Sequence, residues 1–180
     1  YLDNASLDVL LRYFERSGAL RRDGNTIRFV DDEARSFVKG GWLELHAIHA
    51  VNLVHKELNI QDKAIGLEIA DTATDTRNEL DIAFMARNRL FIIECKTARI
   101  DKVEFRGDKA IAPKANDALF KLAENCRRIG GLGARGLLLS YRRLGPAELR
   151  LASSLGIEVV HGNEIARLPE KLKAWVKPQP

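Results

Sequence analysis

The 180-residue sequence contains few cysteines and no long hydrophobic run. Its two cysteines, Cys95 and Cys126, are too few for the disulfide framework of a small secreted domain, so we expect a reducing, cytoplasmic environment. No apolar stretch is long enough to span a bilayer, no signal-peptide pattern opens the chain, and we expect no membrane partner. Internal repeats and low-complexity segments are also missing. These absences exclude disulfide-stapled, membrane-spanning and repeat proteins.

The overall composition is that of a soluble globular protein, with 46% hydrophobic and 30% charged residues. The length predicts one domain, or one domain with a small appendage. The first residue is Tyr1 rather than Met, so we expect a fragment or a processed product that lacks an upstream domain. The net charge is +4, and residues 99–150 hold 12 Lys and Arg against 6 Asp and Glu. This excess favours an anionic partner, although a solvated basic surface explains the charge equally well.

Apolar spacing predicts an α/β domain after a short N-terminal segment. Residues 6–16 predict a helix and residues 19–30 a hairpin, the outline of a winged-helix-like unit over 1–39, and Gly40-Gly41 is expected to break the chain. A three-strand meander and a βαβ crossover then predict a mixed sheet with helices on both faces over 40–180. The expected elements are a helix at 42–58, strands at 63–69, 79–85 and 90–97, a loop at 98–115, a helix at 116–129, a strand at 135–141, a helix at 146–156, a strand at 157–160 and a helix at 169–176.

Four ionisable side chains interrupt two otherwise apolar strands, Glu79 and Asp81 in the first and Glu94 and Lys96 in the second. Residues two apart in a strand point to the same face, so each pair shares a face. A tight turn near Arg87-Asn88 pairs positions whose numbers sum to 175. In this register Asp81 lies opposite Glu94 and Glu79 opposite Lys96, with Cβ atoms about 4.5–5.5 Å apart.

Two carboxylates held this close disfavour double ionisation, and a divalent cation between them reverses that repulsion. Asp81 and Glu94 are therefore candidate ligands of Mg²⁺ or Mn²⁺, which leave coordination places for water and phosphate. Lys96 could orient the attacking water or neutralise charge in the transition state. The pattern predicts a phosphodiesterase site. The alternative is structural, with a Glu79–Lys96 cross-strand ion pair and the other two carboxylates at a wet strand end.

Asp81 together with Glu94-Cys95-Lys96 resembles the PD-(D/E)xK nuclease motif, with a separation of 13 residues between the two acids. Leu80 stands where the motif name places proline. The resemblance implies a restriction-endonuclease-like αβββαβ core and a metal-dependent endonuclease.

A closer resemblance rests on three segments, GGWLE at 40–44, NELD at 78–81 and IECKT at 93–97. Together they resemble the nuclease half of CARF-containing accessory nucleases of type III CRISPR systems. The resemblance implies a linker over 1–39 and a nuclease domain over 40–180, a homodimer, and cleavage of DNA or RNA. It further implies that cyclic oligoadenylate acts only through an upstream domain that is absent here. The site residues that it implies are the catalytic Asp81, Glu94 and Lys96, with Glu44 facing the site. Glu79 is expected either to support the metal ligands from behind or to be a further metal contact.

Basic side chains around the helix at 116–129 are candidate phosphate contacts, with a solvated surface as the alternative for each. They are Lys114, Lys121, Arg127 and Arg128. Two other functions stay open. One is a non-catalytic nucleic-acid-binding or dimerisation module of the same fold, and the other is a nuclease of DNA repair or of a mobile element.

Overall fold

A computed structural model describes most of the chain, and these residues form two compact units, Tyr1–Trp42 and Leu43–Pro180. The division falls three residues after the boundary that the sequence suggests, and the roles expected for the two parts stay predictions. The described residues are 4–24, 26–71, 76–97, 104–106, 109–111, 114–130 and 133–177.

The first unit contains the expected helix and hairpin. Its elements are α1 (Asn4–Arg16), β1 (Leu20–Asp23), β2 (Thr26–Phe29), α2 (Asp32–Ser36) and the π-helical turn η1 (Phe37–Gly41). Arg22 of β1 forms ion pairs with Asp8 and Glu15 of α1, which link the hairpin to this helix. The expected break at Gly40-Gly41 is wrong, because both residues lie in η1, directly before α3. Glycine lowers helix stability by only about 1 kcal/mol per residue, which neighbouring turns can outweigh.

The second unit is built on a mixed sheet in the order β3-β4-β5-β8-β9. The β3–β4 and β4–β5 pairs are antiparallel, and the β5–β8 and β8–β9 pairs are parallel, as the meander and crossover predict. Its elements are α3 (Trp42–Leu58), β3 (Ile60–Asp71), β4 (Thr76–Ala86), β5 (Arg89–Lys96), α4 (Lys114–Gly130), β8 (Arg135–Ser140), α5 (Pro146–Ser154), β9 (Glu158–His161), η3 (Gly162–Arg167) and α6 (Leu168–Val176).

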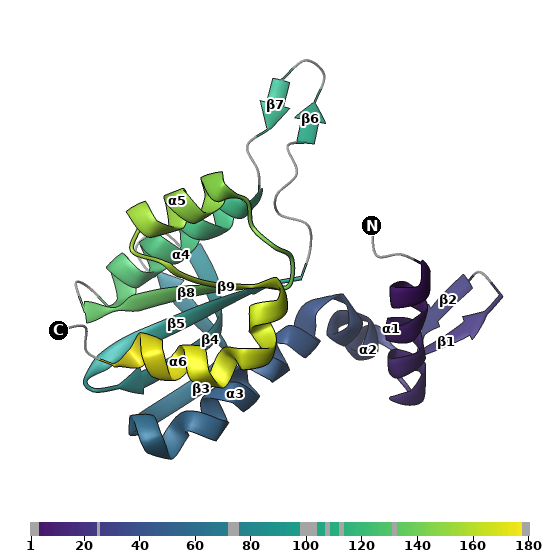
Figure 1. Cartoon of the computed structure of the whole chain (residues 1–180), viewed down its shortest axis with the longest axis horizontal. Helices are drawn as coiled ribbons and strands as arrows, with labels where there is room; N and C mark the ends of the chain where they lie inside the picture. The colour runs from purple at the N-terminus through teal and green to yellow at the C-terminus, as the bar shows by residue number, and fades with distance from the viewer. Residues whose placement is uncertain are drawn as a thin grey trace. The chain divides into compact units, whose positions relative to one another are not determined.

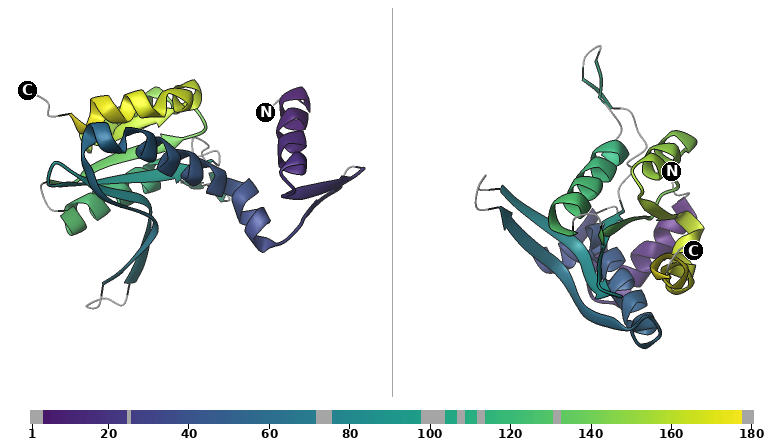
Figure 2. Two further views of the ribbon diagram at one scale, coloured as in Figure 1. Left: turned by 90° about the horizontal axis from the view of Figure 1, so that it is seen from below. Right: turned by 90° about the vertical axis from the view of Figure 1, so that its left-hand side faces the viewer.

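Helices cover both faces of this sheet, with α4 and α5 on one side and α3 and α6 on the other (Figures 1 and 2). On the first side, Leu119 of α4 packs with Ile92 and Leu138 in a buried cluster. On the second side, the Trp175 ring of α6 lies edge-on 5.0 Å from the Phe91 ring. The central strand β5 is therefore buried on both faces, which explains why its sequence is almost continuously apolar.

The two strands β3 and β4 are irregular at Gly66 and Asp81. Pairing is regular on both sides of this point, Ile65 with Ile82 and Leu67 with Leu80, but Gly66 has φ 61°. Leu80 belongs to the α4-side cluster together with Ala83, although strict alternation would place these two side chains on opposite faces. Strict alternation therefore fails at Leu80, because the strands are distorted where Asp81 lies.

Several elements differ from the predicted bounds. The strands β3 and β4 extend beyond the ends predicted at 69 and 79, because their outer residues pair with one another as far as Asp71 and Thr76. The loop expected at 98–115 contains a short ribbon, β6 (Glu104–Arg106) paired with β7 (Lys109–Ile111), and the start of α4. Of the helices in the described residues, none combines the length and apolar character needed to cross a membrane.

Candidate active site

The β4–β5 hairpin places the predicted acids at one end of the central strand pair. Its loop consists of Arg87 and Asn88, both in the left-handed region at φ 52° and 59°, as expected for a two-residue turn of the I′ kind. The ladder runs from Ala86 paired with Arg89 to Ile82 paired with Ile93. The predicted register is confirmed over this ladder. Asp81 and Glu94 are the next residues along the two strands, so the predicted Asp81–Glu94 and Glu79–Lys96 pairs lie beyond its end.

Two hydrogen bonds hold the three central side chains at the end of β5. Asp81 Oδ2 accepts a hydrogen bond of 2.6 Å from the backbone N–H of Cys95. Lys96 Nζ donates to Glu94 Oε1 at 2.5 Å, and Glu94 is 4% exposed. The partner of Lys96 is thus the carboxylate on its own strand rather than Glu79 across the sheet. The structure therefore brings Asp81, Glu94 and Lys96 together within one half-buried site.

The charges of this group are coupled. Burial raises the pKa of Asp81 to about 6, and the negative charge of Glu94 adds to this shift. The hydrogen bond from Cys95 N–H and the charge of Lys96 act in the opposite direction but are outweighed. Burial lowers the pKa of Lys96, yet the charge and hydrogen bond of Glu94 outweigh burial and leave that pKa raised. Lys96 is therefore a cation at neutral pH, and it can donate a hydrogen bond but not accept a proton.

Two further acids belong to the same surroundings. Glu44, in the first turn of α3, has a raised pKa because it is partly buried and because Glu79 is nearby, while Lys96 opposes the shift. Glu79 Oε1 lies 3.3 Å from the position that a Cβ on Gly66 would occupy, so the carboxylate extends across β3 at the irregular point of the sheet. The structure thus places both predicted supporting acids within electrostatic reach of the site.

The two carboxylates fit a hard divalent cation whose remaining coordination places are filled by other ligands. Within the described residues, no three His, Cys, Asp or Glu side chains converge as a metal centre of their own. Mg²⁺ commonly binds through only one or two carboxylates, together with waters and substrate phosphate. The negative charge of Glu94 raises the pKa of Asp81, and a cation bound between the two carboxylates would relieve that repulsion.

A cysteine nucleophile is excluded by the surroundings of Cys95. The residue is 8% exposed, and burial, reinforced by the charge of Asp81, raises the pKa of its thiol well above the ordinary value. The thiol form is poorly nucleophilic. Cys95 is therefore a core residue.

The structure places some of the basic residues of α4 that the sequence offers as candidate phosphate contacts. Lys121 is exposed, and Arg127 is engaged by Glu124 through hydrogen bonds of 2.7 and 3.0 Å. The C-terminal end of α4 lies by the start of β5, since a Cβ on Gly130 would be 3.5 Å from Leu90, whereas the carboxylates lie at the end of that strand. The structure does not bring Arg127 to the acids. Arg128 belongs to the same end of the helix, and the side chain of Lys114 lies outside the described part.

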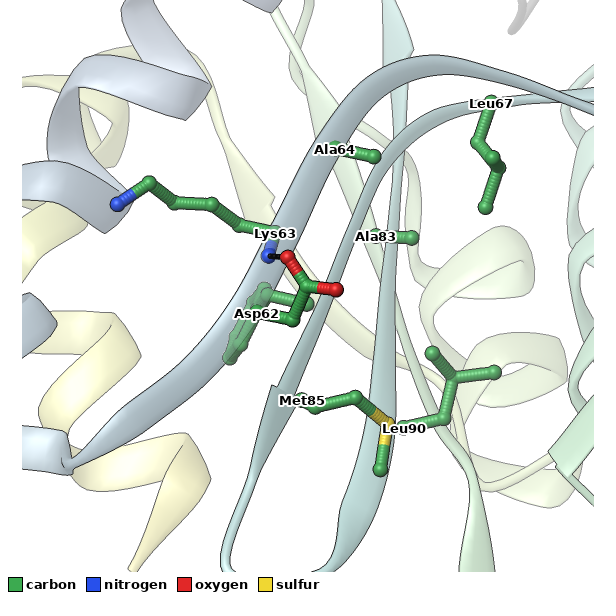
Figure 3. Close-up of a pocket in the computed structure, with 8 residues that line it drawn as sticks. Asp62, Lys63, Ala64, Leu67, Ala83, Met85 and Leu90 are labelled. Atoms are coloured by element: carbon green, nitrogen blue, oxygen red, sulfur yellow. Dashed lines mark hydrogen bonds between the residues drawn. The ribbon is translucent and has the colours of Figure 1, made fainter.

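A cavity on the β3 side of the sheet is separate from these acids. It is lined mainly by Ala64, Leu67, Met85 and Leu90, and Figure 3 shows the Lys63 side chain pointing away from them. None of the central site residues lines this cavity. It therefore does not form part of the candidate active site.

The sequence analysis did not single out the segment that follows β8. Tyr141 N donates a hydrogen bond of 2.9 Å to the carbonyl oxygen of Lys96, which places Tyr141 and Arg142 at the rim of the site. The signal in the sequence is a cationic pair directly after a buried strand. Its relevance depends on the order of strands in the sheet, which the sequence does not state.

This fold and this arrangement of residues define a nuclease of the restriction-endonuclease-like, PD-(D/E)xK class. The chain belongs to the family of Card1-like endonuclease domains, whose model matches residues 31–178.

Two solved structures share the fold of this chain. Can2 from Sulfobacillus thermosulfidooxidans, solved in complex with cyclic tetra-adenylate, has a TM-score of 0.75 at 22% identity and covers 93% of this chain. Protein VC1899 from Vibrio cholerae has a TM-score of 0.75 at 28% identity and covers 95% of this chain. The alignments span only 45% and 43% of those two proteins. Among curated proteins none matches this chain significantly.

Proposed function

We propose that this chain is a metal-dependent endonuclease domain that hydrolyses phosphodiester bonds in DNA or RNA. The observation that carries the proposal is the group formed by Asp81, Glu94 and Lys96 at the end of the β4–β5 hairpin. Membership of an endonuclease family supports the reaction class.

In the proposed reaction, Asp81 and Glu94 hold Mg²⁺ or Mn²⁺. When bound, such an ion polarises a phosphoryl oxygen and lowers the pKa of a coordinated water. Asp81 is held in position by its bond to Cys95 N–H, so little reorganisation of this carboxylate is needed. Glu94 is held by Lys96 and by burial, which fixes the second carboxylate in the same way.

Lys96 is proposed to assist the attack of water on phosphorus. Because its pKa is raised, the ammonium group stays charged and can donate a hydrogen bond to the water or to a phosphoryl oxygen. As the oxygen of the water would bond to phosphorus, the bond to the leaving oxygen would break, the proton of the water would pass to a phosphoryl oxygen or to solvent, and the leaving oxygen would take up a proton from solvent. The Lys96 ammonium would stabilise the negative charge that builds up on the phosphoryl oxygens. Glu44 and Glu79 are proposed to support the site by increasing its negative charge, which favours a bound cation.

We also propose that the whole protein is a CRISPR accessory nuclease that acts as a homodimer and is activated by cyclic oligoadenylate. This chain spans less than half of the length of Can2, which was solved with cyclic tetra-adenylate bound. The activator would therefore bind through a sensor domain outside this sequence.

The test is a cleavage assay on single- and double-stranded DNA and RNA, with Mg²⁺ or Mn²⁺ and with EDTA. Asp81→Asn, Glu94→Gln and Lys96→Met should each lower the rate by at least about 100-fold, because each removes a charge from the reacting group. Glu158→Gln, which changes an exposed carboxylate on β9, should leave the rate unchanged.

Cleavage that persists unchanged in all three variants would refute the site assignment. Cleavage that is unaffected by EDTA would refute the metal requirement. Salt-sensitive binding of nucleic acid without metal-dependent cleavage, also in the full-length parent, would favour the non-catalytic alternative. Preference for branched or duplex DNA would instead favour a nuclease of DNA repair.

A further inference from the structure

The segment Tyr141–Arg143 follows β8 and begins beside the end of β5. Ser140, the last residue of β8, pairs with Lys96 in the parallel ladder, and Tyr141 N donates to the Lys96 carbonyl oxygen at 2.9 Å. In open α/β sheets, ligands bind beyond the carboxyl ends of the strands. The segment therefore occupies the edge of the sheet where a substrate of the proposed nuclease would lie.

Arg142 is held in a defined position at this edge. Its guanidinium carbon lies 5.4 Å from the centre of the Tyr141 ring, within the range of a cation–π contact. Its backbone carbonyl oxygen accepts a hydrogen bond of 2.8 Å from Ser140 Oγ, which fixes the turn after the strand. Both the backbone and the guanidinium group of Arg142 are therefore restrained.

One donor of this guanidinium lacks a partner. Arg142 Nε is buried, and no acceptor in the described part of the chain is bonded to it. Buried polar groups are hydrogen-bonded in nearly all native proteins, because an unpaired donor is costly. An unpaired arginine donor beside the proposed site points to an acceptor that arrives with a ligand. Arginine pairs in particular with the oxygens of phosphate.

The negative charge of the site also favours a basic side chain near the path of the substrate. Among the described residues whose charges act on one another here, Glu44, Asp81 and Glu94 oppose the positive charge of Lys96. A phosphodiester strand that approaches these carboxylates is repelled unless positive groups lie along its path. Arg142, with the exposed Arg143 next to it, provides positive charge at the rim.

We propose that Arg142 is a substrate-binding residue that contacts a backbone phosphate of the nucleic-acid strand beside the scissile phosphate, and that Tyr141 is a positioning residue that holds its guanidinium. This inference rests on the proposed function. A phosphate contact carries no sequence information, so the contribution is equal for strands of different sequence.

The test measures binding of labelled single-stranded DNA and RNA oligonucleotides by fluorescence anisotropy over a range of salt concentrations. The measurement uses the Asp81→Asn chain so that the oligonucleotide is not cut. Arg142→Ala should raise Kd about tenfold and reduce the slope of log K against log salt by about 0.7, the value for one phosphate contact on a single strand. Arg142→Lys should keep most of the slope but only part of the affinity, because the charge remains and the fork is lost.

The matched control is Arg89→Ala. Arg89 is an exposed arginine at the first position of β5, seven residues from Lys96 and thus at the other end of the strand. It removes the same charge and should change neither Kd nor the slope. Circular dichroism of each variant checks that the chain is folded.

Tyr141 is tested through its dependence on Arg142. Tyr141→Phe keeps the ring and should bind like the parent, whereas Tyr141→Leu should weaken binding severalfold. In a double-mutant cycle the effect of Tyr141→Leu should vanish when Arg142 is alanine, because the ring acts through the guanidinium. A merely structural role of Tyr141 would weaken binding equally in both backgrounds.

The two proposals fail in distinguishable ways. If the unmodified chain cleaves nucleic acid and Arg142→Ala leaves KM, Kd and the salt slope unchanged, the role of Arg142 is overturned and the nuclease stands. If the chain and its full-length parent neither bind nor cleave nucleic acid, the proposed function fails, and the inference fails with it.

Discussion

Replacing Asp81 by asparagine should make the metal-free protein more stable at neutral pH while it abolishes cleavage. The carboxylate is half-buried beside Glu94, and its pKa is raised from 3.8 to about 6. Asparagine has nearly the same shape, and its Oδ1 can still accept the hydrogen bond that Cys95 N–H donates. The substitution therefore removes an unfavourable charge with little loss of contact.

The sign and size follow from proton linkage. Between pH 3.8 and about 6 the folded protein binds more protons at Asp81 than the unfolded chain, so the free energy of unfolding falls as pH rises through this window. A shift of two pKa units corresponds to about 3 kcal/mol, and partial solvent screening reduces it to about 1–3 kcal/mol. Asp81→Asn should thus be more stable than the parent by this amount above pH 6, and equally stable below pH 3.8.

Urea unfolding in EDTA, followed by the fluorescence of the buried Trp175, measures this difference at several pH values. Glu158→Gln, which neutralises an exposed carboxylate, is the control and should leave the pH dependence unchanged. Mg²⁺ or Mn²⁺ should then stabilise the parent but not Asp81→Asn, because only the parent retains both proposed ligands. An asparagine variant that is less stable than the parent at neutral pH would refute the electrostatic reasoning.

Two further predictions concern stability. Lys96→Met should lower the free energy of unfolding by about 2–4 kcal/mol, because Glu94 stays buried without the Lys96 ammonium group. Adding Glu94→Gln should restore part of the loss, and a double variant no more stable than Lys96→Met would contradict this. Gly136→Ala should lower the free energy of unfolding by about 1–3 kcal/mol through overpacking, because the new Cβ would lie 2.6 Å from Ile157 Cδ1. The control is Gly133→Ala, whose Cβ meets no atom within 4 Å and which should change stability by less than about 0.5 kcal/mol. Urea unfolding measures both variants, and equal effects would refute the packing argument.

The β-hairpin that carries the acids was predictable because its determinants are local. A two-residue turn at Arg87-Asn88 sets the register, and the register decides that Asp81 and Glu94 are neighbours. The helix at 42–58 was equally accessible, since its buried residues recur at helical spacing and its bounds agree with α3. In both cases the evidence lies within about 20 consecutive residues.

Features that depend on distant segments were not predictable in this way. The alternation rule failed at Leu80, because the irregular point of the sheet involves Gly66 on another strand. The sequence offered the basic residues of α4 as candidate phosphate contacts but could not place them relative to the acids, and that role stays a prediction; Arg127 lies at the end of the helix next to the start of β5. Tyr141 was not noticed at all, because its bond to Lys96 depends on β8 lying beside β5.

The sequence by itself determined the type of chemistry, because an acid pair and a lysine on two strands joined by a tight turn become neighbours whatever the rest of the chain does. The tertiary structure alone decided which other groups share their surroundings. Glu44 approaches from α3 and Tyr141 from the segment that follows β8, and burial within the folded chain raises the pKa of Asp81. Desolvation and long-range Coulomb interactions depend on how whole elements pack, and no local pattern of residues encodes that packing.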